Sequence, residues 1–285
     1  MTGNIIHIPV SFELIDTVRK GYDLLDKSIQ AEVAGFVSSK QHENGLFTGR
    51  DKTPDFYYSL FGAWISEALG LSNSLEKLKL FFVENESKSN LKSSIDSFAS
   101  ILIQHLMFGD NYKKLGFIYL FKFLLGKGIH ISIAYRAFFF LLTYDSIYKR
   151  KKLVKLLGRI PLFLYNPPPD SPCSLKAAII ILKQAAGMKV KKEANLLFSY
   201  YEEGKGFKVF CHLDTADLLS TAVSLFALEK AGADLRLMAP SCIRLVENNY
   251  RTGAFISGDG DESKDLEYTF YGLLALGTLN KYPLH

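Results

Sequence analysis

The residues best placed to do chemistry lie in one glycine-rich stretch, residues 45–59. It reads Gly-Leu-Phe-Thr-Gly-Arg-Asp-Lys-Thr-Pro-Asp-Phe-Tyr-Tyr-Ser, so two cations, Arg50 and Lys52, precede Asp55 and Tyr58. A guanidinium and an ammonium just before a helix N-terminus form a combination that binds phosphate groups. The stretch therefore predicts a diphosphate-binding loop. The alternative is a pair of solvent-exposed loop cations.

Aromatic side chains accompany this loop on the elements that follow it. They recur at helical spacing in the helix after the loop and in the last helix of the chain, as Tyr57, Tyr58, Phe61, Trp64, Tyr268 and Tyr271. Aromatic faces suit an apolar chain and stabilise a nearby cation. The pattern predicts an aromatic-lined cavity, with ordinary core packing as the alternative.

The 45–59 stretch is one copy of an internal repeat. Each copy has a glycine turn with a phenylalanine, a polar loop, an Asp, and then a Ser or Thr four residues on. The copies begin at Gly45, Gly206 and Gly253, and their aspartates are Asp55, Asp217 and Asp265. Gly permits a tight turn. An Asp at a helix start accepts a hydrogen bond from a free backbone N–H, so we expect the three aspartates to be N-caps.

Nearly all of the chain has helical periodicity, and no segment has the alternation of a strand. A 48% hydrophobic composition is sufficient for a large core. Small residues on the helices allow close packing, so the repeat predicts an all-α fold, a single α/α toroid of about a dozen helices over residues 1–285. The expected helices are 10–27, 29–39, 54–69, 72–83, 91–107, 112–125, 129–144, 146–162, 174–186, 191–201, 216–231, 234–247 and 264–279.

The repeat resembles that of the β subunits of protein prenyltransferases and, more distantly, that of the squalene-hopene and oxidosqualene cyclases. In the prenyltransferases the matching loop binds an isoprenoid diphosphate through an Arg, a Lys and a Tyr. The resemblance assigns these roles to Arg50, Lys52 and Tyr58, with Arg50 one residue closer to the Lys than in the family. It also places Asp55 at a zinc ligand.

Two of the three zinc positions of that family differ here. Tyr57 stands where the family has Cys, and Tyr268 stands where it has His. The catalytic zinc of the prenyltransferases activates a thiol. The resemblance therefore argues against zinc and against protein farnesylation by the usual mechanism, whereas Mg²⁺ accompanying a diphosphate stays open.

The cyclases protonate an alkene with the middle Asp of an Asp-x-Asp-Asp-Thr-Ala motif. Residues 217–222 have that outline, but Leu219 replaces the acid. A second acidic run, Asp259 to Glu262, is interpreted as a solvated loop, because exposed carboxylates rarely have raised pKa values. Asp55 and Asp265 remain the candidate catalytic acids or metal contacts.

Composition limits the other classes of function. The net charge is +5, and its basic run at 148–159 is interpreted as a solvated helix face, which argues against nucleic-acid binding. Three distant cysteines, Cys173, Cys211 and Cys242, favour a reducing compartment and predict a cytoplasmic protein. Neither a signal peptide nor a membrane-spanning segment is expected.

Together these features predict an isoprenoid-diphosphate-handling enzyme, similar to a terpene cyclase or a prenyltransferase. The substrate-binding residues would be Arg50, Lys52, Tyr57, Tyr58, Trp64, Tyr268 and Tyr271, with no metal ligands. The alternative is a non-catalytic toroid that binds a lipid or a protein partner.

Overall fold

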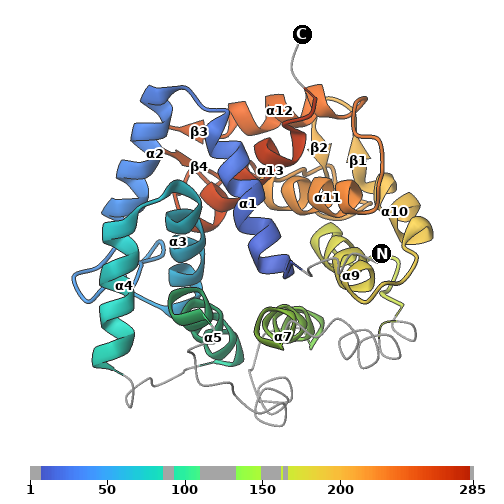
Figure 1. Cartoon of the computed structure of the whole chain (residues 1–285). Helices are drawn as coiled ribbons and strands as arrows, with labels where there is room; N and C mark the ends of the chain where they lie inside the picture. Colours follow the sequence, from blue (N-terminus) through green and yellow to red (C-terminus); the bar gives the residue numbers. More distant parts are fainter. Residues whose placement is uncertain (1–7, 86–92, 110–132, 149–161, 163–165, 283–285) are drawn as a thin grey trace, which may run out of the picture.

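The computed structural model describes residues 8–85, 93–109, 133–148, 162 and 166–282. This part of the chain is mostly helical, and its elements follow one another as shown in Figure 1. The helices are α1 Val10–Asp23, α2 Lys27–Ser39, α3 Phe56–Leu69, α4 Ser72–Glu84, α5 Ser94–Phe108, α7 Ile133–Tyr148, α9 Cys173–Ala185, α10 Lys191–Leu197, α11 Leu218–Lys230, α12 Ala239–Asn248 and α13 Leu266–Leu279. The all-α expectation is confirmed at this level.

The expected helices are largely found, with changes at their ends. Residues 10–27 do not form one helix, because α1 ends at Asp23 and α2 begins at Lys27. Ser72 or Asn73 would be the expected N-cap of the helix at 72–83, but α4 begins at Ser72 and its N-cap is Leu71, which makes no side-chain capping hydrogen bond. The expected helix at 112–125 and most of the basic helix at 146–162 lie outside the described residues.

The expectation that the chain has no strand was wrong. Two short antiparallel hairpins are present, β1 (Tyr201–Glu202) with β2 (Gly206–Phe207) and β3 (Tyr250–Arg251) with β4 (Ala254–Phe255). Isolated bridges give the first repeat a similar turn, in which Gln41 pairs with Phe47. Strands of two residues are too short to show alternation in a sequence, so the glycine turn is their only local signal.

Each hairpin is attached to the helix that follows it by the same contacts. The phenylalanines Phe47, Phe207 and Phe255 are completely or almost completely buried. Their backbone N–H groups donate to the hydroxyl oxygens of Ser59, Thr221 and Thr269, at 2.8, 3.0 and 3.3 Å. The Ser or Thr of the repeat therefore satisfies a buried donor that would otherwise cost about 1–3 kcal/mol.

The packing of the helices follows a regular order. In the described residues α3 contacts α5, α5 contacts α7, α7 contacts α9, α9 contacts α11, α11 contacts α13, and α13 contacts α3. The helices between them lie against these: α4 packs on α3 and α5, α10 on α9 and α11, and α12 on α11 and α13. Figure 1 shows α1 across the centre of this arrangement, and its contacts are with α13, α3 and α7.

Two glycines allow α1 and α13 to pack closely. A Cβ atom added at Gly277 would lie 1.8 Å from the carbonyl oxygen of Thr17, and one added at Gly21 would lie 1.9 Å from that of Leu273. No other residue type fits at these separations. At its other end, α1 is anchored to α7, because the backbone N–H of Val10 donates to Asp145 at 3.0 Å.

Candidate functional site

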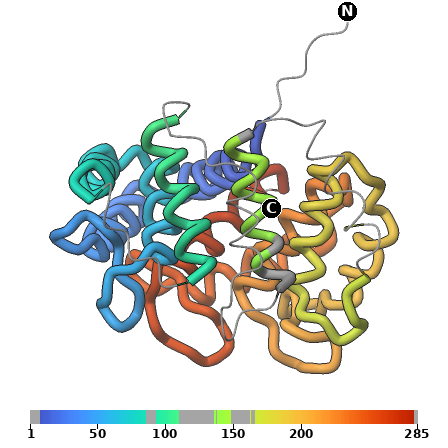
Figure 2. Tube along the Cα trace, turned by 90° about the horizontal axis from the view of Figure 1, so that it is seen from below, coloured from blue at the N-terminus to red at the C-terminus, as the bar shows by residue number. Residues whose placement is uncertain are grey.

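The N-termini of four helices meet at one end of the molecule, which we call the mouth. The backbone N–H of Leu218 in α11 donates to Ser257, in the loop before α13, at 2.8 Å. The N–H of Cys173 in α9 likewise donates to Val209, in the loop before α11, at 2.8 Å. Arg50, in the loop before α3, donates to Asp265 at the start of α13. Figure 2 shows the loops before α3, α11 and α13 along one edge of the molecule.

The three repeat aspartates cap the helices at the mouth, as predicted. Their carboxylates accept from the backbone N–H three residues on: Asp55 from Tyr58 at 2.7 Å, Asp217 from Ser220 at 2.6 Å, and Asp265 from Tyr268 at 2.8 Å. Burial raises the pKa of Asp55 and that of Asp217, against the lowering effect of these hydrogen bonds. A structural role is thus present at each position.

Arg50 forms ion pairs with two carboxylates of the last repeat. Its Nε donates to Asp265 at 2.7 Å, and Nη1 donates to Asp261. The guanidinium also lies 5.6 Å from the centre of the Tyr268 ring. Asp265 is completely buried, so Arg50 supplies the positive charge that balances it. Asp261, expected in a solvated loop, therefore holds the cation predicted to bind diphosphate.

Lys52 lies apart from this network. Its side chain is exposed, its backbone has a positive φ of 61°, and it forms no ion pair with the described residues. Tyr58 is half-buried, and burial together with Asp265 and Glu267 raises the pKa of its phenol to about 12. The predicted diphosphate-binding residues thus lie at the mouth, and of the two cations Arg50 is held in ion pairs while Lys52 forms none with the described residues.

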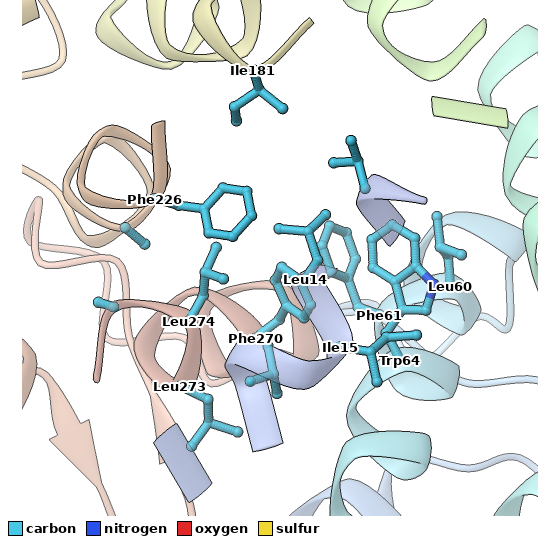
Figure 3. Packing of buried hydrophobic residues seen from close by; sticks show 14 of the residues in the cluster. Leu14, Ile15, Leu60, Phe61, Trp64, Ile181, Phe226, Phe270, Leu273 and Leu274 are labelled. Atoms are coloured by element: carbon cyan, nitrogen blue, oxygen red, sulfur yellow. The ribbon is translucent and has the colours of Figure 1, made fainter. Parts of the chain in front are cut away.

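An apolar cavity of about 480 Å³ lies among the helices. Side chains from α1, α3, α7, α9, α11 and α13 form its wall, and Figure 3 shows several of them converging from separate helices. The volume is within the usual range for sites that bind small molecules. The lining residues are Val10, Leu14, Phe61, Trp64, Phe138, Phe139, Leu142, Pro172, Ser174, Leu175, Ala178, Ile181, Leu219, Val223, Phe226, Phe270, Tyr271 and Leu274.

The repeat decides which positions reach this cavity. Six residues after the cap aspartate come Phe61, Val223 and Tyr271, and nine residues after it come Trp64, Phe226 and Leu274; all six line the cavity. Positions 3–4 residues apart share one face of a helix, so the position two residues after the cap lies on the same face, one turn closer to the mouth. In α11 that position is Leu219, which also lines the cavity.

The corresponding position in α13 is Glu267, a residue that the sequence analysis did not single out. The third copy reads Asp265-Leu-Glu267-Tyr-Thr269, so a carboxylic acid stands two residues after the cap. The signal in the sequence is this Asp-x-Glu-x-Thr pattern, which has the spacing of the cyclase motif but lacks its Thr-Ala ending.

Glu267 is hydrogen-bonded across to the first repeat. Its Oε1 accepts from the hydroxyl of Tyr57 at 2.7 Å, and Tyr57 is the residue two positions after the cap in α3. Burial raises the pKa of Glu267 to about 7, while the Tyr57 hydrogen bond opposes that rise. The residue keeps some exposed surface even though protein surrounds its carboxyl, a combination expected of a side chain in a concave wall.

The structure therefore separates the predicted site residues into two groups. Trp64 and Tyr271 line the cavity. The others, Arg50, Lys52, Asp55, Tyr57, Tyr58, Asp265 and Tyr268, belong to the loops and first helical turns at the mouth. In the described part of the chain, no three His, Cys, Asp or Glu side chains are grouped as metal ligands.

Comparison with known proteins gives no relative. No family model, no curated protein and no solved structure matches the chain. Among the described helices, none combines the length and the apolar character needed to cross a membrane.

Proposed function

We propose that this protein is an enzyme of the terpene-cyclase type, which holds an isoprenoid chain in the apolar cavity and protonates it from Glu267. The observation that carries the proposal is the position of Glu267. It is a carboxylic acid four residues before Tyr271 of the cavity wall, so helical spacing places it on the same face of α13, one turn closer to the mouth. Burial raises its pKa to about 7. A general acid works best when its pKa lies near the working pH.

The resemblance to the cyclases supports the same residue. Their acid is two residues after the first Asp of the motif, and Glu267 is two residues after Asp265. In such a step the carboxyl O–H bond breaks, a C–H bond forms with the alkene electron pair, and a carbocation and a carboxylate result. Phe61, Trp64 and Phe226 in the cavity wall would stabilise the cation.

We further propose that the helices form an α/α toroid around this cavity. The support is the order of contacts, in which α3, α5, α7, α9, α11 and α13 each touch the next and α13 returns to α3. In this arrangement the first and last repeats are neighbours, and the cavity occupies the axis.

A diphosphate on the substrate would lie at the mouth, close to Lys52 and Arg50. The pairing of Arg50 with Asp261 and Asp265 weakens that part of the proposal, because a diphosphate would have to displace a carboxylate. Acid-initiated cyclisation of the chain therefore fits the geometry better than a prenyltransferase reaction that depends on a cationic loop.

Product analysis tests the proposal. The protein is incubated with farnesyl diphosphate, geranylgeranyl diphosphate, farnesol and squalene, and the extracts are analysed by gas chromatography with mass spectrometry. We expect a cyclised product from at least one substrate, and its loss in Glu267→Gln with binding retained. Production of the same cyclised product by the Glu267→Gln variant would refute the role of the acid.

A second function, non-catalytic binding of a lipid, is supported by the cavity itself. Most of its described wall is hydrocarbon, with Ser174 and Tyr271 as the hydroxyl-bearing side chains. Such a wall suits any apolar chain. Native mass spectrometry that detects bound farnesol or fatty acid, together with unchanged substrate in every product assay, would support this function over the enzyme.

A further inference from the structure

The hydrogen bond between Tyr57 and Glu267 joins the first and the last repeat at the mouth. We propose that Tyr57 is a positioning residue, which holds Oε1 of Glu267 so that the acidic proton resides on Oε2 at the cavity entrance. This inference rests on the proposed function, because it assigns a role to Tyr57 in the same site. It also replaces the expectation that Tyr57 contacts the substrate directly.

The geometry of the pair carries the inference. Tyr57 donates its hydroxyl hydrogen to Oε1 at 2.7 Å, which occupies that oxygen as an acceptor. Oε2 has no hydrogen-bond partner among the described residues. A protonated carboxyl therefore keeps its hydrogen on Oε2. Glu267 shares a helix face with Tyr271 of the cavity wall and lies one turn closer to the mouth, and Leu219, at the same register in α11, lines the cavity.

The phenol ring of Tyr57 is itself held in place. It makes edge-to-face contacts with Tyr58, with centroids 5.5 Å apart, and with Phe61, with centroids 5.2 Å apart. Phe61 in turn packs edge-to-face on Phe270 and Tyr271 of α13. These contacts fix the direction of the hydroxyl and connect it to the wall of the cavity.

Several other charged or titratable groups face Glu267. Arg50, from the loop before α3, favours the carboxylate, whereas Asp265 in α13 and Asp217 in α11 favour the neutral acid. The phenols of Tyr58 and Tyr268 also face it. Tyr57 differs from all of these groups, because it donates a hydrogen bond to the Glu267 carboxyl. Removing the Tyr57 hydroxyl should therefore change the pKa of Glu267 by deleting a single hydrogen bond.

The test is a titration of the Glu267 carboxyl in the full-length, ligand-free protein. Carbon-13 NMR of the glutamate carboxyls follows the resonance that disappears in Glu267→Gln. In Tyr57→Phe we expect the midpoint to rise by about one pH unit or more, because a hydrogen bond to the charged form is lost. Tyr58→Phe is the matched control, since Tyr58 packs on the ring of Tyr57 but forms no hydrogen bond to Glu267. In this variant the titration midpoint of Glu267 should stay near that of the native protein.

An unchanged midpoint in Tyr57→Phe, or an equal shift in both variants, would overturn the inference. A second measurement avoids dependence on the folding of Tyr57→Phe: 3-fluorotyrosine at position 57 keeps the ring and donates more strongly, so the midpoint should fall. The titration needs no substrate. Its failure removes the role of Tyr57 alone, whereas a normal titration without any cyclised product removes the proposed enzyme and leaves the hydrogen-bonded pair in place.

Discussion

Replacing Glu267 by Gln should stabilise the protein at alkaline pH and leave its stability nearly unchanged at acidic pH. The folded-state pKa of Glu267 is raised from 4.5 to about 7, chiefly by burial. Between these values the folded protein binds more protons than the unfolded chain, so the free energy of unfolding falls as the pH rises. Gln has the same shape, accepts the same hydrogen bond from Tyr57, and cannot ionise.

The magnitude follows from the shift. A difference of about 2.5 pH units at about 1.4 kcal/mol per unit gives a loss of about 3 kcal/mol in the native protein by pH 8.5. Glu267→Gln does not lose this free energy of unfolding, because its side chain cannot ionise. With a urea m-value of about 3 kcal/mol/M, its unfolding midpoint should lie about 1 M higher than that of the native protein at pH 8.5.

Urea unfolding followed by circular dichroism at pH 4.5 and at pH 8.5 measures the effect. Glu262→Gln is the control, because Glu262 is an exposed glutamate whose ion pair with Arg251 contributes little to stability. The same difference between Glu267→Gln and the native protein at both pH values would refute the reasoning, since it would mean that Glu267 does not change its proton affinity on folding.

Three further predictions concern contacts within the fold. Gly277→Ala should lower the free energy of unfolding by about 3 kcal/mol or more, because the new Cβ would lie 1.8 Å from a carbonyl oxygen of α1. Gly35 has open space around it, so Gly35→Ala should raise the free energy of unfolding by up to about 1 kcal/mol, and thermal unfolding of both variants compares the two effects. Arg50→Met should lower the free energy of unfolding by about 2–3 kcal/mol, which is less than for a fully buried ion pair because Arg50 is partly exposed. In a double-mutant cycle, adding Asp265→Asn should recover part of that loss, because the buried charge is removed as well. Thr269→Val should cost about 1–3 kcal/mol by leaving a buried backbone N–H without an acceptor, as the shift of the urea midpoint would report.

Local features of the fold could be predicted from the sequence because a few neighbouring residues determine them. An N-cap needs only an Asp and the first turn of its helix, so Asp55, Asp217 and Asp265 were assigned correctly. The hairpins were missed for a related reason, because two residues per strand give no periodic pattern. Their buried phenylalanines were nevertheless part of the repeat.

A closed ring predicts that the first and last repeats are neighbours, so that Asp55, Tyr57 and Tyr58 face Asp265 and Tyr268. The individual hydrogen bonds and ion pairs of the candidate site could not be predicted, because they join distant parts of the chain. Arg50 pairs with Asp265, which is 215 residues away, and Tyr57 bonds to Glu267, which is 210 residues away. Each of these residues, taken alone, looks like a loop cation, an N-cap, an aromatic core residue or an exposed helix acid. Only the return of α13 to α3 brings them together.

That return places buried ionisable groups at the junction between the first and last repeats. The same junction holds the ion pair of the partly exposed Arg50 with the buried Asp265, and the acid Glu267 with its phenol donor. A carboxyl with a pKa raised to about 7 reduces stability at neutral pH, and the packing around it must offset that cost. A loss of contact between α3 and α13 at the mouth should therefore hydrate Glu267 and lower its pKa towards 4.5. The proton affinity of Glu267 therefore depends on whether α3 and α13 remain in contact at the mouth.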